Sequence, residues 1–134
     1  MESKIKITTF DEGLVIKISG DLDSSKTFLY REKIHQYMRE YGPRYMIWDF
    51  KDLTFIDSAG VGLILGRFNE IERIKGVMGL IGLNSYSRKV IQISGLFGIM
   101  KEYSSVKAFL KEEKITLWVI VSNLNLKLLC PTNY

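Results

Sequence analysis

Short apolar runs alternate with stretches of helical periodicity through most of this chain. An apolar–polar alternation is typical of a strand, and apolar residues recurring every three or four positions are typical of a helix. Strands that alternate with helices predict an α/β domain with a mostly parallel sheet. The strand patterns occupy residues 5–9, 14–20, 45–50, 77–83 and 99–103, and the helical patterns occupy residues 28–41, 58–74, 87–93 and 106–113.

Turn and cap signals set the order of these elements. Asp11-Glu12-Gly13 joins the first two strand patterns into an N-terminal hairpin. The first helix has N-cap candidates between Asp21 and Ser25 and a stop signal at Gly42-Pro43. Residues 51–57 are interpreted as a connecting loop. We therefore expect a single domain with a sheet of four to five strands, covered by about four helices.

The length of 134 residues suits one domain, which we assign to residues 1–113. Residues 114–134 form a C-terminal extension of unknown role. It contains the apolar run Ile115–Val121 and no acidic residue, and it is too short to span a bilayer. An extra strand, an arm that docks a partner and poorly ordered sequence all stay open for it.

The low content of cysteine and histidine argues against several classes of protein. Cys130 and His35 are the only residues of their types, so an internal disulfide is impossible and a zinc site of Cys and His ligands is not supported. His35 lies in a helical pattern without a nucleophile motif nearby, and we interpret it as a surface or boundary residue.

Charge and hydropathy also restrict the partners. The formal net charge is +4, but the basic residues are scattered, whereas a nucleic-acid surface needs them clustered. The N-terminus has no hydrophobic signal region, and no apolar run has the length of a membrane span. We expect a cytoplasmic protein with no cofactor, no direct nucleic-acid partner and no membrane partner.

The segment Asp57–Phe68 carries the clearest functional signal. Its simplest interpretation is structural, because Ser58 suits the N-cap of the following helix. A dinucleotide-binding interpretation fits poorly, since the glycine that would complete Gly60-x-Gly62-x-x-Gly comes one position late, at Gly66. No acidic residue follows in the strand 77–83.

Ser58 is also suited to accept a phosphate. A serine at the start of a helix is exposed, and the helix tolerates the nearly two negative charges of a phosphoserine. A protein that packs on the same spot would meet a hydrated dianion beside Asp57 and, as we expect, beside Asp21 and Asp23. Phosphorylation of Ser58 would then break an interface without unfolding the domain.

The helix that follows Ser58 offers a surface for such a partner. Val61, Ile64, Leu65, Phe68 and Ile71 share one face, which we expect to pack on the sheet. The opposite face carries Ala59, Gly62, Gly66, Asn69 and Arg73, and its first two turns are nearly bare of side chains. We expect Leu63, at the edge of this face, to be an exposed apolar anchor. The alternative for Gly62 and Gly66 is close packing against the domain's own loops.

Four blocks of sequence resemble the STAS-domain anti-sigma factor antagonists, most closely the sporulation members that antagonise anti-sigma-F factor. Together they cover most of residues 4–113. The departures are Ala59, where close relatives often have a second serine, and the loop 84–87, which lacks a proline often found there. The blocks are residues 52–68, 19–23, 66–71 and 94–99.

The resemblance implies a partner-switching regulator of transcription that is not an enzyme. In that family the anti-sigma factor is also a serine kinase, and it phosphorylates the serine that matches Ser58. The unphosphorylated form binds this kinase and releases the sigma factor, and a phosphoserine phosphatase restores the binding form. The match also places Asp23 near the phosphoserine, and Gly60, Val61 and Gly62 at the partner-facing start of the helix.

Two rival hypotheses stay open. A STAS module of another stress or signalling pathway would share the fold and Ser58, and would bind a different partner or sense a nucleotide. A metal-dependent phosphoryl-transfer enzyme would need magnesium ligands, since carboxylates at strand ends suit this ion. The candidates for those ligands are Asp21, Asp23, Asp49, Asp52 and Asp57.

Overall fold

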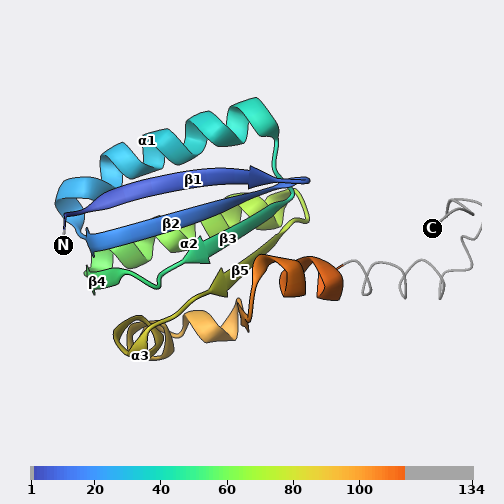
Figure 1. The fold of residues 1–134 in the computed structure, drawn as a ribbon. Coiled ribbons are helices and arrows are strands. Elements are labelled where there is room, and N and C mark those ends of the chain that lie inside the picture. Colours follow the sequence, from blue (N-terminus) through green and yellow to red (C-terminus); the bar gives the residue numbers. More distant parts are fainter. Residues whose placement is uncertain (1, 114–134) are drawn as a thin grey trace, which may run out of the picture.

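The computed structural model describes residues 2–113, which form an α/β domain with one mixed sheet (Figure 1). The predicted N-terminal hairpin and the mostly parallel sheet are confirmed; the predicted extension, residues 114–134, lies outside the described residues. A last helix begins at Val106 and continues to the end of the described residues. The other elements are β1 (Lys4–Phe10), β2 (Gly13–Leu22), α1 (Ser24–Tyr41), β3 (Tyr45–Asp49), β4 (Leu53–Ile56), α2 (Ser58–Arg73), β5 (Val77–Ile81), α3 (Ser85–Ser94), the 3-10 helix η1 (Leu96–Gly98) and β6 (Glu102–Tyr103).

The long strand β2 pairs with three other strands. β1 runs antiparallel along one side, and β3 runs parallel to the first half of the other side. β3 pairs with β2 as far as Lys17, and from Gly20 onward β2 pairs with β4 instead, with a shift in register between Gly20 and Asp21. The expectation that residues 51–57 form only a loop is therefore wrong. β4 has four residues and no clear alternation, and its pairing with the end of β2 is a tertiary contact that local patterns do not report.

The other boundaries differ from the predictions by a few residues. α3 begins at Ser85, two residues early, because the Asn84 side chain caps it by accepting from the Ser87 N–H at 2.8 Å. The fifth predicted strand shortens to Glu102–Tyr103, which pairs with β5. Residues 96–98 form a 3-10 turn in front of it.

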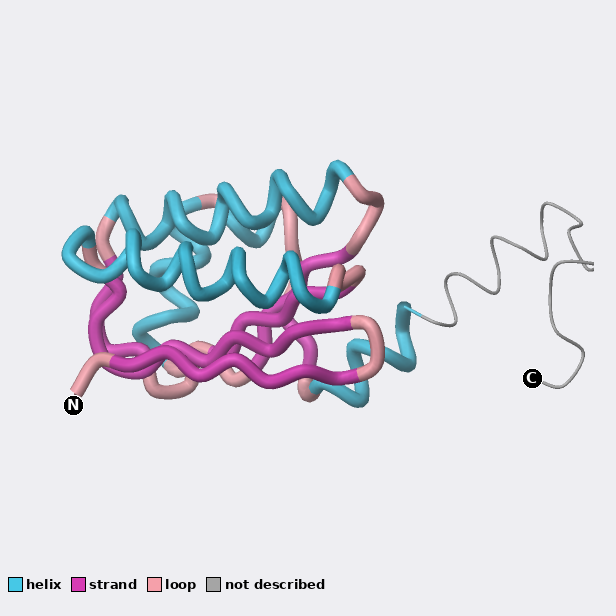
Figure 2. Tube along the Cα trace, turned by 90° about the horizontal axis from the view of Figure 1, so that it is seen from above, coloured by secondary structure: helices cyan, strands magenta, loops and turns pink. Residues whose placement is uncertain are grey.

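Helices lie on both faces of the sheet. α1 and α2 lie side by side on one face (Figure 2), where Ile34 of α1, Ile64 of α2 and Ile91 of α3 belong to the same buried cluster as Trp48. The helix that begins at Val106 packs on the other face, where the ring of Phe109 meets Tyr45 and Tyr103 edge-on. The domain thus has two apolar clusters with the sheet between them.

A polar cluster lies between α1 and α2. His35 Nε2 on α1 is 3.0 Å from a carboxylate oxygen of Glu70 on α2, and Arg67 pairs with the same carboxylate from one turn away. His35 is partly exposed, as predicted for a boundary residue, whereas Arg67 is buried. Burial raises the pKa of Glu70, but the hydrogen bond with His35 and the charge of Arg67 outweigh it, so the pKa of Glu70 is lowered.

This lowered pKa predicts a pH dependence of stability. A carboxyl whose pKa is lowered in the folded state stabilises the fold above its ordinary pKa of 4.5, and the contribution is lost as the pH falls through the folded pKa. The difference in free energy of unfolding between wild type and Glu70→Gln should shrink from about pH 5 downward, as measured by urea denaturation. Glu72→Gln, at an exposed position of the same helix, is the control. A difference that stays constant with pH would contradict this prediction.

Candidate functional site

The start of α2 places Ser58 in an exposed position with a free hydroxyl. Asp57 is the N-cap, because its Oδ1 accepts a hydrogen bond from the Gly60 N–H at 3.0 Å. The interpretation of Ser58 as the cap is therefore wrong; it is the first residue of the helix. Among residues 2–113, no hydrogen bond engages the Ser58 hydroxyl. This hydroxyl is available for chemistry because its neighbour does the capping.

Asp57 also connects α2 to the preceding βα unit. Its Oδ2 accepts a hydrogen bond from the Ser24 N–H, the first N–H of α1, at 3.1 Å. Its backbone N–H donates to the Leu22 carbonyl oxygen at the end of β2, at 3.3 Å. The two helices therefore begin in one corner of the domain, beside the ends of β2 and β4.

Asp23 is the second acidic residue of this corner. It caps α1 by accepting from the Ser25 N–H at 3.0 Å, and it also pairs with Lys26 at 3.4 Å. The hydrogen bond from the Ser25 hydroxyl is the largest cause of a lowered pKa for Asp23, which stays ionised at neutral pH. The structure thus brings Asp23 and Asp57 together at the start of the two helices.

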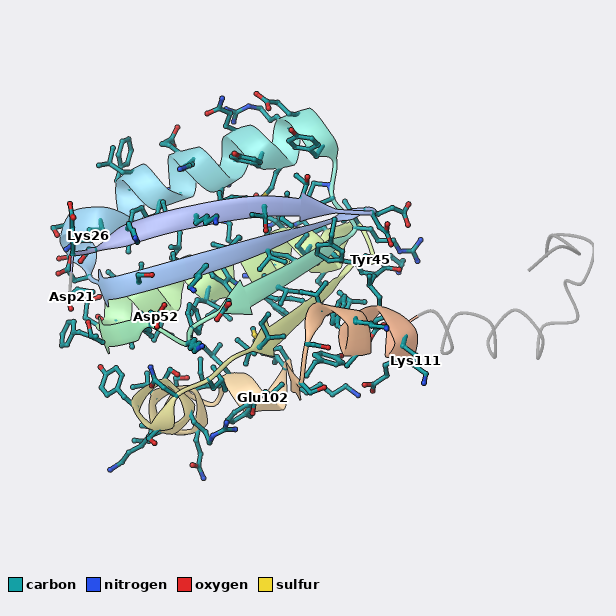
Figure 3. The ribbon with its side chains drawn as sticks, in the orientation of Figure 1. Asp21, Lys26, Tyr45, Asp52, Glu102 and Lys111 are labelled. Atoms are coloured by element: carbon teal, nitrogen blue, oxygen red, sulfur yellow. The ribbon has the colours of Figure 1, made fainter. Side chains whose placement is uncertain are left out.

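Asp21 has a different environment. It lies at the end of the sheet where α1 begins, as Lys26 does (Figure 3). Its Oδ1 accepts a hydrogen bond from the Thr54 hydroxyl on β4 at 3.0 Å. In the part of the chain that the structure describes, no hydrogen bond joins Asp21 to Asp57 or Ser58. Asp21 was predicted to lie beside Ser58, but its side chain bonds to β4, whereas Asp23 caps the start of α1.

The three glycines of α2 have different roles. A Cβ on Gly60 would lie 2.5 Å from the Leu22 carbonyl oxygen and 2.6 Å from Ile56 Cγ1, so this position needs a glycine for close packing. A Cβ on Gly62 or Gly66 would meet nothing within 4 Å outside its own helix. The alternative that Gly62 and Gly66 pack against the chain's own loops is therefore wrong for the described residues.

The buried face of α2 is rotated from the predicted one. Leu63, expected to be an exposed anchor, is only 4% exposed, and Leu65, expected to face the sheet, is 42% exposed. The reason is that α1 packs against the flank of α2 that carries Leu63, Arg67 and Glu70. Ala59 is half-buried near this flank, while Gly62 is exposed.

β4 and α3 also carry exposed apolar side chains, and the sequence analysis did not find them. Phe55 and Tyr86 are 45% and 38% exposed, and the Tyr86 hydroxyl accepts a hydrogen bond from the Ile56 N–H at 3.1 Å. For α3, the sequence signal was a row of apolar residues spaced four and then three positions apart. The residues with this spacing are Tyr86, Val90 and Ile93, followed by Phe97 on η1.

The five aspartates that could have held magnesium have different partners. Asp52 pairs with Lys17 at 3.2 Å, and Asp49 accepts from the Lys51 N–H at 3.1 Å. Within residues 2–113, no three His, Cys, Asp or Glu side chains are grouped so that they could hold a metal ion. No helix in the same range is long and apolar enough to cross a membrane.

Residues 4–109 match the model of the STAS domain. The chain belongs to the STAS domain family. An anti-sigma F factor antagonist of Lysinibacillus sphaericus is 39% identical over 85 residues, which are 63% of this chain and 73% of that relative. Such STAS relatives are named as antagonists of an anti-sigma factor, and these names describe no enzymatic activity.

Solved STAS structures are similar to this domain in fold and in sequence. The unphosphorylated anti-sigma factor antagonist SpoIIAA superposes with a TM-score of 0.65 at 29% identity, covering 83% of this chain and 98% of that one. The phosphorylated form of the Bacillus cell fate determinant SpoIIAA gives a TM-score of 0.65 at 33% identity, covering 81% and 98%. Such relatives therefore exist with and without phosphate on the same fold.

The different packing of the α2 glycines predicts opposite effects of two equal substitutions. Gly60→Ala should lower the free energy of unfolding by about 1–3 kcal/mol, because the methyl group overlaps the Leu22 carbonyl. Gly62→Ala should raise it by about 0.5–1 kcal/mol, because alanine favours the helix and has open space. Urea denaturation of both variants measures these changes. Equal effects of the two substitutions would contradict the assignment.

Proposed function

We propose that this chain is an anti-sigma factor antagonist that is switched by reversible phosphorylation of Ser58. The unphosphorylated form binds an anti-sigma factor that is also a serine kinase, and the bound sigma factor is released. The kinase phosphorylates Ser58 and ends binding, and a phosphoserine phosphatase restores the binding form, all in the cytoplasm. The observation that carries the proposal is the exposed, unbonded Ser58 hydroxyl next to a helix face that has almost no side chains.

The proposed partner surface is centred on the first turns of α2. Gly62 and Gly66 have open space around them, which allows the backbone of another protein to approach closely. Leu65, Phe55 and Tyr86 supply exposed apolar area around them, the role that the sequence analysis assigned to Leu63. Small residues surrounded by apolar side chains suit the core of a protein interface, where packing must be tight. Ala59, Asp21 and Asp23 lie at its margin.

A phosphate on Ser58 would oppose this packing for an electrostatic reason. It adds between one and a half and two negative charges next to the carboxylate of Asp57. A partner that covered it would have to desolvate the dianion without a matching cation, at a cost of about 3 kcal/mol or more. The fold itself tolerates the charge, because the first turn of a helix favours an anion.

Ser24 and Ser85 have the same local position as Ser58. Each is an exposed first residue of a helix that follows an Asp or Asn cap. What distinguishes Ser58 is the open face of its own helix, since α2 has glycines in its first three turns, whereas α1 and α3 have none. We infer that the kinase selects Ser58 by binding this face, so Ser24 and Ser85 are matched controls.

The first test concerns the phosphorylated residue. With the anti-sigma factor kinase and ATP, mass spectrometry should find one phosphate, on Ser58, and none in Ser58→Ala. Ser58→Ala should keep its affinity for the kinase, whereas Ser58→Glu should bind roughly a hundredfold more weakly, because its charge must be desolvated. Ser85→Ala and Ser85→Glu should behave as wild type in both assays. A phosphate on another residue with Ser58 unmodified would refute the mechanism.

The second test concerns the open helix face. Gly62→Arg should weaken kinase binding more than about tenfold, because a long charged side chain fills the space reserved for the partner. Its circular dichroism spectrum and melting temperature should stay close to those of Gly62→Ala, because nothing in the domain itself is displaced. Wild-type affinity of Gly62→Arg would remove α2 from the interface. If the wild-type protein binds the anti-sigma kinase of a different stress pathway instead, that result would favour the rival hypothesis of a STAS module from another pathway.

A further inference from the structure

We propose that the Asp57 carboxylate is a positioning residue for phosphorylation of Ser58, because it ties the first turn of α2 to the Ser24 N–H. This inference rests on the proposed function. Both oxygens of Asp57 are used: Oδ1 accepts from Gly60 within α2, and Oδ2 accepts from Ser24, 33 residues earlier in the chain. The Asp57 N–H also donates to the Leu22 carbonyl and the Asp57 carbonyl accepts from the Val61 N–H, so four hydrogen bonds hold the residue directly before Ser58.

The need for such a tie follows from the freedom of Ser58. Its hydroxyl has no hydrogen-bond partner among residues 2–113, so only the backbone of the first turn directs it. The outer side of this turn has no support, because nothing in the described domain lies near Gly62. The inner side is fixed by Asp57 and by the close approach of Gly60 to Leu22.

Phosphoryl transfer depends strongly on the placement of the attacking oxygen. The bond between Ser58 Oγ and the γ-phosphorus of ATP forms while the bond to the β,γ-bridging oxygen breaks, ADP leaves, and the hydroxyl proton passes to a base of the kinase. A misplacement of about 1 Å costs roughly a hundredfold in rate. Both oxygens of Asp57 accept N–H hydrogen bonds, and within residues 2–113 no hydrogen bond joins this carboxylate to the Ser58 hydroxyl, so we assign it a positioning role.

One substitution removes the tie between the helices and leaves the cap of α2 in place. Ser24→Pro deletes the N–H that Asp57 Oδ2 accepts, and proline is favoured at the first position of a helix. Asp23 has an extended backbone (φ −120°, ψ −179°), which suits a residue before proline. Ser24→Ala is the matched control, because it loses the hydroxyl and keeps the N–H.

Steady-state kinetics with the anti-sigma factor kinase and ATP test the proposal. Ser24→Pro should lower kcat for phosphorylation of Ser58 about tenfold or more, with KM within about twofold of wild type. Its affinity for the kinase, measured with a non-hydrolysable ATP analogue, should also stay within about twofold. Ser24→Ala should match wild type in all three quantities.

A second variant covers the case in which Ser24→Pro fails to fold. In Asp57→Asn the amide oxygen can still accept a hydrogen bond from one of the two N–H groups, but the NH2 group cannot accept from the other. One of the two hydrogen bonds, to Ser24 or to Gly60, is therefore lost. This variant should show the same fall in kcat with unchanged KM.

The outcomes separate the two proposals. If wild type is phosphorylated on Ser58 and the folded variants keep the wild-type kcat, the positioning role is overturned and the proposed function stands. Parallel losses of kcat and of affinity would also overturn it, since they indicate a contact with the kinase. If wild type is not phosphorylated on Ser58, the proposed function fails and this inference fails with it.

Discussion

β2 is the strand on which the rest of the domain depends, because its two edges pair with three strands. β1 occupies one edge, and β3 and β4 share the other. The change of partner occurs at Gly20, which has a φ of +77°, in the left-handed region that glycine adopts most easily. Beyond it, β4 ends beside Leu22, where the chain turns into α1 (Figure 1). The two helices begin in the same corner as a result.

In this corner two aspartates have structural roles, while the hydroxyl of Ser58 is exposed and available for chemistry. Asp23 and Asp57 satisfy backbone N–H groups that the helices leave unpaired at their starts. Had Ser58 been the cap, its hydroxyl would have been engaged in a hydrogen bond. Placing the cap one residue earlier gives the helix its start and leaves the serine exposed at the surface. Ser24 and Ser85 have the same local arrangement at the starts of α1 and α3.

The inner and outer faces of α2 differ in what they contact. Its inner face packs on the sheet and on α1, where the hydrogen bond between His35 and Glu70 joins the two helices and Arg67 pairs with the same carboxylate. Its outer face has glycines with open space and the exposed Leu65. A protein surface without side chains costs little conformational entropy to cover, because it has no rotamers to immobilise. That property suits the partner surface that we propose for this face.

Local sequence patterns determined much of this protein. The alternation of strand and helix patterns was enough for the α/β class, and Gly42 and Gly95 mark helix ends where the backbone is left-handed. The segment Asp57–Phe68 was enough to single out Ser58, because its glycines and serine follow one another in the chain. These features depend on neighbouring residues, which a sequence displays directly.

Contacts between distant residues decided the rest. The pairing of β4 with the end of β2, the bond from Ser24 to Asp57 and the burial of Leu63 under α1 all join segments brought together only by folding. Helical periodicity gives the apolar side of α2, but the position of α1 decides which flank of it is covered. For the same reason only the tertiary structure shows that Tyr86 of α3 lies beside the end of β4. The cap of α2 is a local contact, but Asp and Ser are both favoured N-cap residues, so residue type alone does not decide between Asp57 and Ser58.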